Sequence, residues 1–155
     1  YRKTFSADAF FTSSNAVTEN GELYNVDGNS NRVAAILYGP KSVVVVCGVN
    51  KLVKNIDEAV ERVKTKAAPP NTVRLGIDTY CAKAGQCVSL NKENPELCEG
   101  CHGDGGQCVS LNKENPELCE GCHGDGRICC NYVVCAQQRH VNRIKVIIIN
   151  EELGY

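Results

Sequence analysis

Residues 12–51 decide the fold and read TSSNAVTENGELYNVDGNSNRVAAILYGPKSVVVVCGVNK. In this stretch, small polar residues are crowded between the apolar segments Ala9–Phe11 and Val43–Val46. Loops at strand ends are where α/β proteins bind their ligands, and a chain that only had to turn would need fewer polar groups. We therefore expect a ligand site among the polar residues of this block, which are Ser13, Ser14, Asn15, Thr18, Glu19, Asp27, Asn29, Ser30, Asn31 and Arg32.

The same block predicts a strand–hairpin–helix–strand order. Residues 8–12 are apolar and flanked by polar residues, which indicates a buried strand. Asn20-Gly21 is typical of a type I′ hairpin turn. Residues 32–38 form a short apolar helix that Gly39-Pro40 ends. Residues 42–49 are a β-branched run, as expected for a strand buried on both faces of a parallel sheet.

The loop before the predicted helix has two interpretations. As a site, its N–H groups and the helix dipole would favour an anion, with Arg32 adding positive charge. As structure, it is a capping loop in which Ser30 or Asn31 satisfies the first helical turn. Lys51, at the end of the buried strand, would likewise hold a phosphate or carboxylate, or else be a solvated residue that opens the next helix.

Length, charge and hydropathy limit the class of protein. The 155 residues are enough for one domain with its own core. A net charge of −1 argues against nucleic acid or an anionic membrane as the partner. The longest apolar runs are too short to span a bilayer, and no signal peptide opens the chain. We therefore expect a cytoplasmic protein that binds neither nucleic acid nor membrane.

Cysteine is the compositional outlier, with 11 residues of which only Cys47 lies outside residues 81–135. Residues 85–105 are repeated letter for letter at residues 106–126. Two identical copies indicate a recent duplication or a reconstruction error rather than a solenoid. We expect one copy to belong to the fold and the other to extend a surface loop. Residues 81–130 are thus predicted to form a cysteine-rich insertion in an α/β domain.

With one copy removed, the cysteines follow the pattern C-x5-C-x10-C-x2-C, with two more cysteines close behind. Thiolates at this spacing suit zinc or an iron–sulfur cluster. The alternatives are incidental cysteines in a polar loop, or a haem attached at Cys98-x-x-Cys101-His102 or at its copy Cys119-x-x-Cys122-His123, with His140 as the distal ligand. The candidate metal ligands are Cys81, Cys87, Cys98, Cys101, Cys119, Cys122, Cys129 and Cys130.

The remaining chain supplies elements but no catalytic motif. Residues 56–66 have an apolar stripe at helical spacing, and we expect residues 67–71, with their two prolines, to end this helix. Residues 131–136 and 143–150 are predicted strands. The sequence contains no P-loop, no GxGxxG, no HExxH and no GxSxG.

The block from Thr12 to Lys51 resembles the LUD domain, which is named for lactate utilisation. The shared pattern is T-S-x-N-A-x-T-x-x-G-E-L-x-N-x-D-G-x-x-N-R-V-A, then G-P-K, then V-x-G-V-N-K. It continues in Ala68-Pro-Pro-Asn71, in Arg74-Leu75, in Cys81-Ala-Lys-Ala-Gly-Gln-Cys87, in Arg127-Ile-Cys-Cys-Asn131 and in Glu152-Leu-Gly-Tyr155.

The resemblance implies an α/β fold similar to the NagB/RpiA/CoA-transferase group, with a mostly parallel sheet flanked by helices. It implies a cytosolic bacterial protein, some relatives of which work beside iron–sulfur and oxidoreductase subunits in oxidising L-lactate to pyruvate. Family members carry further elements before the equivalent of Asp8, so the single domain over residues 1–155 would lack its N-terminal part. The chain would then be an accessory subunit or an enzyme in its own right.

Three functions stay open. The first is binding of a small anionic metabolite or cofactor. The second is an electron-transfer or assembly subunit built on a cysteine-bound cluster. The third is a CoA-transferase-like enzyme, for which Glu19 and Glu152 are the candidate acyl-forming glutamates. For the first, the expected binding residues are Asn15, Glu19, Asp27, Asn31, Arg32, Asn50 and Lys51.

Overall fold

The computed structural model describes residues 2–90 and 126–155, which fall into two compact units. The first unit contains Tyr1–Glu61 and Cys130–Tyr155, and the second contains Arg62–Cys129. Most of the predicted insertion lies outside the described residues, and the expected single domain and insertion stay predictions. The same holds for the predicted ligands and haem-type motifs at Cys98, Cys101, His102, Cys119, Cys122 and His123.

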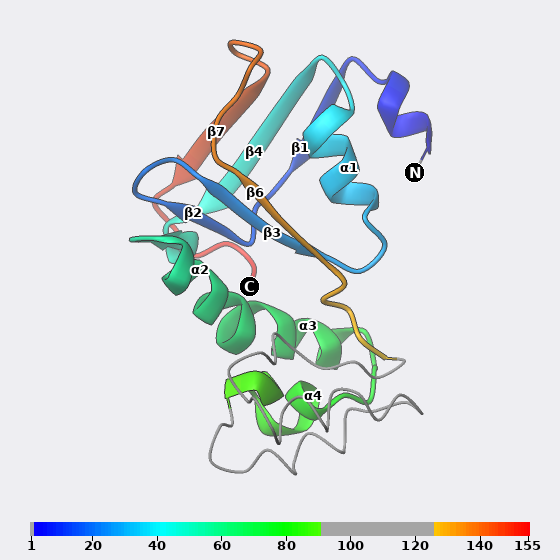
Figure 1. The fold of residues 1–155 in the computed structure, drawn as a ribbon, viewed down its shortest axis with the longest axis vertical. Coiled ribbons are helices and arrows are strands. Elements are labelled where there is room, and N and C mark those ends of the chain that lie inside the picture. Colours follow the sequence, from blue (N-terminus) through cyan, green and yellow to red (C-terminus); the bar gives the residue numbers. More distant parts are fainter. Residues whose placement is uncertain (1, 91–125) are drawn as a thin grey trace. The chain divides into compact units, whose positions relative to one another are not determined.

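The first unit is built on a three-stranded parallel sheet in the order β1-β4-β7 (Figure 1). Its strands are β1 (Ala9–Thr12), β4 (Ser42–Gly48) and β7 (Ile144–Ile149). In register, Val44 of β4 lies between Phe11 and Lys145. The prediction of an α/β protein with a mostly parallel sheet flanked by helices is confirmed, and all three predicted strands are present.

A second sheet of four short strands has the order β5-β2-β3-β6. It consists of β5 (Leu52–Val53), β2 (Ala16–Thr18), β3 (Leu23–Asp27) and β6 (Asn131–Cys135). The predicted hairpin joins β2 to β3, but the predicted type I′ turn is wrong. Only Gly21 has a positive φ in this turn, at 85°. The Gly21 N–H donates to the Thr18 carbonyl and the Thr18 N–H to the Glu22 carbonyl, which is a type I turn followed by a glycine bulge.

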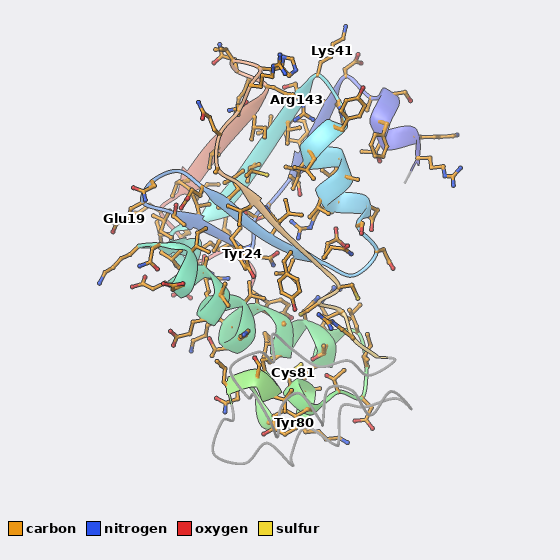
Figure 2. All side chains as sticks on the ribbon, viewed as in Figure 1. Glu19, Tyr24, Lys41, Tyr80, Cys81 and Arg143 are labelled. Carbon is orange, nitrogen blue, oxygen red and sulfur yellow. The ribbon has the colours of Figure 1, made fainter. Side chains whose placement is uncertain are left out.

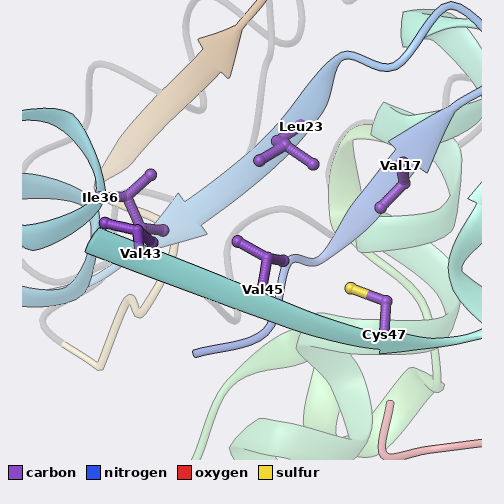
Figure 3. Close-up of a cluster of buried hydrophobic side chains, with 6 residues drawn as sticks. All are labelled: Val17, Leu23, Ile36, Val43, Val45 and Cys47. Carbon is purple, nitrogen blue, oxygen red and sulfur yellow. The ribbon is translucent and has the colours of Figure 1, made fainter. Parts of the chain in front are cut away.

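The core of the first unit lies between β4 and the β2–β3 hairpin and is closed by helix α1 (Asn31–Tyr38) (Figure 3). Alternate residues of β4, namely Val43, Val45 and Cys47, are fully buried on one face. Ile36 of α1 packs into the same cluster; burying such a side chain stabilises the fold by about 1.5–3 kcal/mol.

The opposite face of β4 carries Val44 and Val46, which are only half-buried. Phe11, the neighbour of Val44 on β1, is exposed. The prediction that β4 is buried on both faces is therefore wrong among the described residues. The alternation of buried and half-buried residues is that of a sheet covered on one side.

Helical segments account for the rest of the described structure. A 3-10 turn (Arg2–Ser6) precedes β1, and another, η2 (Val49–Lys51), follows β4. Helix α2 spans Ile56–Arg62. The second unit contains a π-helical turn (Val63–Ala67), α3 (Ala68–Arg74), α4 (Tyr80–Ala84) and a 3-10 turn (Val88–Leu90). No helix within residues 2–90 and 126–155 is long and apolar enough to cross a membrane.

The expected helix end at the two prolines is wrong, because Pro69 and Pro70 lie in the first turn of α3 instead. Proline is tolerated in a first helical turn, where its missing N–H needs no partner and its φ is already helical. The π-helical turn over Val63–Ala67 directly precedes them. The chain thus stays helical through a segment that proline content alone marks as a break.

Candidate functional site

The polar residues of the first unit gather around the guanidinium group of Arg32, in the first turn of α1. Its Nη1 donates to the Ser13 carbonyl at 3.1 Å and to Asn25 Oδ1. Its Nη2 donates to Asn15 Oδ1 and to the Val26 carbonyl, both at 3.0 Å. Four bonds from one side chain thus hold together the chain after β1, strand β3 and helix α1.

The start of α1 is held by Asp27, the last residue of β3. Asp27 Oδ2 accepts from the backbone N–H groups of Arg32 at 3.1 Å and Val33 at 3.2 Å, and Oδ1 accepts from the Asn29 N–H at 3.1 Å. Ser30, one of the two expected caps, makes no side-chain capping bond and has a positive φ of 61°. A carboxylate at this position also interacts favourably with the positive end of the helix dipole.

Asn25 is the most deeply buried polar residue near Arg32, with an exposed fraction of 0 %. Its Oδ1 accepts from Arg32, but its Nδ2 has no hydrogen-bond partner among the described residues. An unpaired buried donor costs about 1–3 kcal/mol, so native proteins rarely leave one unsatisfied. The amide therefore marks a place where an acceptor atom would be stabilised.

Burial dominates the electrostatics of Arg32. It lowers the pKa of the guanidinium below its ordinary value, and the nearby Asp27 carboxylate and Cys47 thiol raise that pKa in part. A guanidinium nevertheless stays protonated in proteins. A desolvated positive charge consequently lies beside the unpaired Asn25 donor.

A second cation, Lys51, is linked to this cluster through Ser13. Lys51 ends η2 and is only 7 % exposed, and its Nζ donates to Ser13 Oγ at 3.1 Å. The Ser13 hydroxyl also lies 3.5 Å from the Sγ atom of Cys47, which accepts from the Ser14 N–H at 3.4 Å. Ser13 thus contacts both cations, Arg32 through its carbonyl and Lys51 through its hydroxyl.

Asn50 holds the C-terminal residues. Its Nδ2 donates to the Gly154 carbonyl at 3.0 Å, and its Oδ1 accepts from the Leu153 N–H at 3.1 Å. Gly154 has a positive φ of 62°, and a Cβ placed there would lie 3.7 Å from the Lys51 ammonium. The C-terminal residues therefore pass close to the second cation.

The structure brings together Asn15, Asp27, Arg32 and Lys51 among the predicted binding residues. Asn31 is the first residue of α1 and is half-buried. The two candidate glutamates are exposed: Glu19 lies in the β2–β3 turn, where Figure 2 labels it, and Glu152 lies beyond β7.

The seven binding residues expected from the sequence did not include Ser13, Asn25 or Cys47, although Ser13 was one of the polar residues of the block in which a site was expected. The sequence offered one reason to select Asn25 as a site residue. Asparagine is disfavoured inside a strand, and here it interrupts an otherwise apolar run from Leu23 to Val26. Ser13 was one polar residue among many in its loop, and Cys47 lay within an apolar run. Nothing in the sequence set these two apart.

The described cysteines are free thiols, and two of those in the second unit, Cys81 and Cys87, have hydroxyl neighbours. The Cys81 Sγ atom, labelled in Figure 2, lies 3.6 Å from Thr72 Oγ1 and 3.3 Å from Thr79 Oγ1. The Ser89 hydroxyl donates to Cys87 Sγ at 3.3 Å. Within residues 2–90 and 126–155, no three His, Cys, Asp or Glu residues are grouped to hold a metal ion. The metal site, four of whose eight candidate ligands lie outside these residues, stays a prediction.

Comparison with known proteins identifies one family. The model of the LUD domain family matches residues 1–149, which is nearly the whole chain. No curated protein and no solved structure matches the chain. The predicted resemblance to this family is confirmed.

Proposed function

Because the chain belongs to the LUD domain family, a family related to lactate utilisation, we propose that it binds a small anionic metabolite and supports the oxidation of L-lactate to pyruvate. This oxidation releases two electrons and two protons. In our proposal, an oxidoreductase or iron–sulfur subunit accepts the electrons, and this chain acts as the accessory subunit that holds the carboxylate. The expected relation to the NagB/RpiA/CoA-transferase group belongs to the same proposal.

The unpaired Nδ2 donor of Asn25 is the observation that carries this proposal. It is fully buried and belongs to a residue that already contacts the Arg32 guanidinium. A carboxylate or phosphate oxygen would satisfy the donor, and the adjacent positive charge would stabilise the anion. L-lactate and pyruvate both carry such a carboxylate.

Arg32 serves this site as a positioning residue. Its two terminal nitrogens carry four N–H groups, and the structure gives these nitrogens four acceptors on the protein. The guanidinium therefore supplies charge and fixes Asn15 and Asn25, rather than offering a free fork to a ligand. Lys51 and the Ser13 hydroxyl complete the positively charged surroundings.

The test is ligand-induced stabilisation measured with the 155-residue chain. Melting temperature and calorimetric binding would be followed with L-lactate, pyruvate, acetate and inorganic phosphate. Asn25→Asp is the informative variant, because it keeps an oxygen for Arg32 but replaces the Nδ2 donor with a second anionic oxygen. Lys41→Gln is the matched control, since Lys41, labelled in Figure 2, is an exposed cation that precedes β4, whereas Lys51 follows that strand.

We expect at least one of these anions to raise the melting temperature of the unmodified chain and of Lys41→Gln. Asn25→Asp should lose that shift, because two carboxylates would face each other at the same place. The proposal fails if none of the anions binds the unmodified chain. It fails equally if Asn25→Asp binds as tightly as the unmodified chain.

A further inference from the structure

β7 is an aliphatic strand whose outer edge has no strand partner among the described residues. β7 ends the sheet order β1-β4-β7, and Figure 1 shows it on the outside of that sheet. Val146, Ile147, Ile148 and Ile149 are 41 %, 49 %, 39 % and 37 % exposed. Successive residues of a strand point to opposite faces, so β7 is open on both faces as well as at its edge.

The hydrogen bonds to β4 show which residues of β7 point outward. The Val43 N–H donates to the Arg143 carbonyl and the Val49 N–H to the Glu151 carbonyl. Odd-numbered residues therefore direct their backbone groups toward β4. In a parallel ladder the direction alternates with each residue, so even-numbered residues direct theirs to the open edge.

One of the outward positions is already occupied by the chain itself. The Gln138 side-chain amide accepts from the Ile144 N–H at 2.6 Å and donates to the Ile144 carbonyl at 2.8 Å. The open backbone positions that follow are Val146, Ile148 and Asn150. They are spaced two residues apart, as the rungs of an antiparallel ladder require.

The charges around this strand are arranged for pairing with itself. Lys145 lies at the start of the aliphatic run, and Glu151 lies just after it. If two copies of β7 pair antiparallel about a two-fold axis through Ile148, residue 145 of one copy lies opposite residue 151 of the other. Each Lys145 then faces a Glu151 of the second copy, an arrangement that stabilises an antiparallel pair.

We propose that the partner of this edge is a second copy of the chain, paired antiparallel along β7 about Ile148. This register uses all three open positions, because Val146 of one copy pairs with Asn150 of the other, and the Ile148 residues of the two copies pair with each other. An axis through Ile147 would instead pair Asn150 with Ile144, whose backbone groups Gln138 already occupies. The two three-stranded sheets would join into one of six strands, with the closed two-fold symmetry usual for homodimers.

The Lys145 ammonium keeps a hydrogen-bond donor for the contact with Glu151 of the second copy. Its ammonium donates to Ser42 Oγ at 3.0 Å and to the Asn142 carbonyl at 2.7 Å. Lysine has three N–H donors, so one remains for Glu151 of the second copy. Monomeric proteins commonly protect an aliphatic edge with a lysine directed into solvent or with a proline or bulge. Here Lys145 is drawn onto its own chain, and Val146–Ile149 contain none of these features.

The mass of the chain in solution, followed by sedimentation over a range of concentrations, tests the proposal. The unmodified chain should reach the mass of a dimer. Lys145→Glu and Glu151→Lys should each weaken association by about tenfold or more, because each change makes two attractive contacts repulsive. The double variant Lys145→Glu/Glu151→Lys should restore association. A monomeric unmodified chain, or single variants that associate like it, would overturn the proposal.

Amide hydrogen exchange gives a second readout that does not depend on variants. In a dimer, the N–H groups of Val146 and Ile148 should exchange slowly only at concentrations where the dimer forms. The N–H groups of Lys145 and Ile147, which face β4, serve as the internal control and should be protected at all concentrations. Protection of Val146 and Ile148 in the monomer would mean that residues of the same chain cover the edge, and it would refute the dimer.

Discussion

Removing the carboxylate of Asp27 should destabilise the first unit, because this side chain both starts α1 and lies near the half-buried Arg32 guanidinium. Asp27→Ala leaves the N–H groups of Arg32, Val33 and Asn29 without their acceptors. Loss of a helix N-cap costs about 1 kcal/mol, and loss of an anion at the helix start costs about 0.5 kcal/mol. The Asn29 bond adds about 0.5 kcal/mol, because it is exposed. The expected loss of unfolding free energy is therefore about 2 kcal/mol.

Urea unfolding monitored by circular dichroism measures this loss. Asp27→Asn keeps one acceptor oxygen for α1 but loses the charge, so it should cost about half as much as Asp27→Ala. Asp8→Ala is the matched control, because Asp8 is exposed just before β1 and such changes stay within about 0.5 kcal/mol. If Asp27→Ala unfolds at the same urea concentration as Asp8→Ala, the capping role assigned to Asp27 is incorrect.

Three further outcomes are expected. Arg143→Gln should lower the unfolding free energy by about 2 kcal/mol, because the Arg143 guanidinium donates to the carbonyls of Ala35, Ile36 and Pro40 around the end of α1. A variant that unfolds at the same urea concentration as the unmodified chain would contradict this prediction. Burial raises the pKa of the Cys135 thiol, and Arg143 lowers that pKa in part. Alkylation of Cys135, followed by mass spectrometry, should therefore be slow at neutral pH and accelerate only in more alkaline solution. Alkylation as fast as that of a small free thiol at pH 7 would contradict this prediction. If the cysteine-rich segment binds metal, anaerobically purified protein should contain zinc, or iron with sulfide and visible absorbance; metal-free protein would make the cysteines incidental.

The elements that sequence predicted best are those in which local preference and tertiary packing agree. The run Val43–Val46 forms the predicted strand β4, and Asn20-Gly21 lies in the predicted hairpin between β2 and β3, although with a different turn type. Gly39-Pro40 likewise ends α1 where expected. These signals are local, so they survive without knowledge of the neighbours.

The errors arose where one local sequence pattern is compatible with two structures. Pro69 and Pro70 looked like a helix end, yet a first helical turn accommodates them. Asp27 caps α1 from five residues away, a role that Ser30 and Asn31 seemed better placed to fill. Four of the expected binding residues, Asn15, Asp27, Arg32 and Lys51, are linked to one another directly or through Ser13, and their role in binding a ligand stays a prediction. The buried donor of Asn25 became visible only from its missing partner.

Gly48 gives the C-terminal residues their route over the end of β4. A Cβ at this position would overlap the Glu151 carbonyl and the Leu153 nitrogen. Any other residue at position 48 would push away the segment that Asn50 binds and that passes Lys51. In a saturation mutagenesis screen for ligand binding, position 48 should therefore be as intolerant as a contact residue, although it has no side chain with which to touch a ligand.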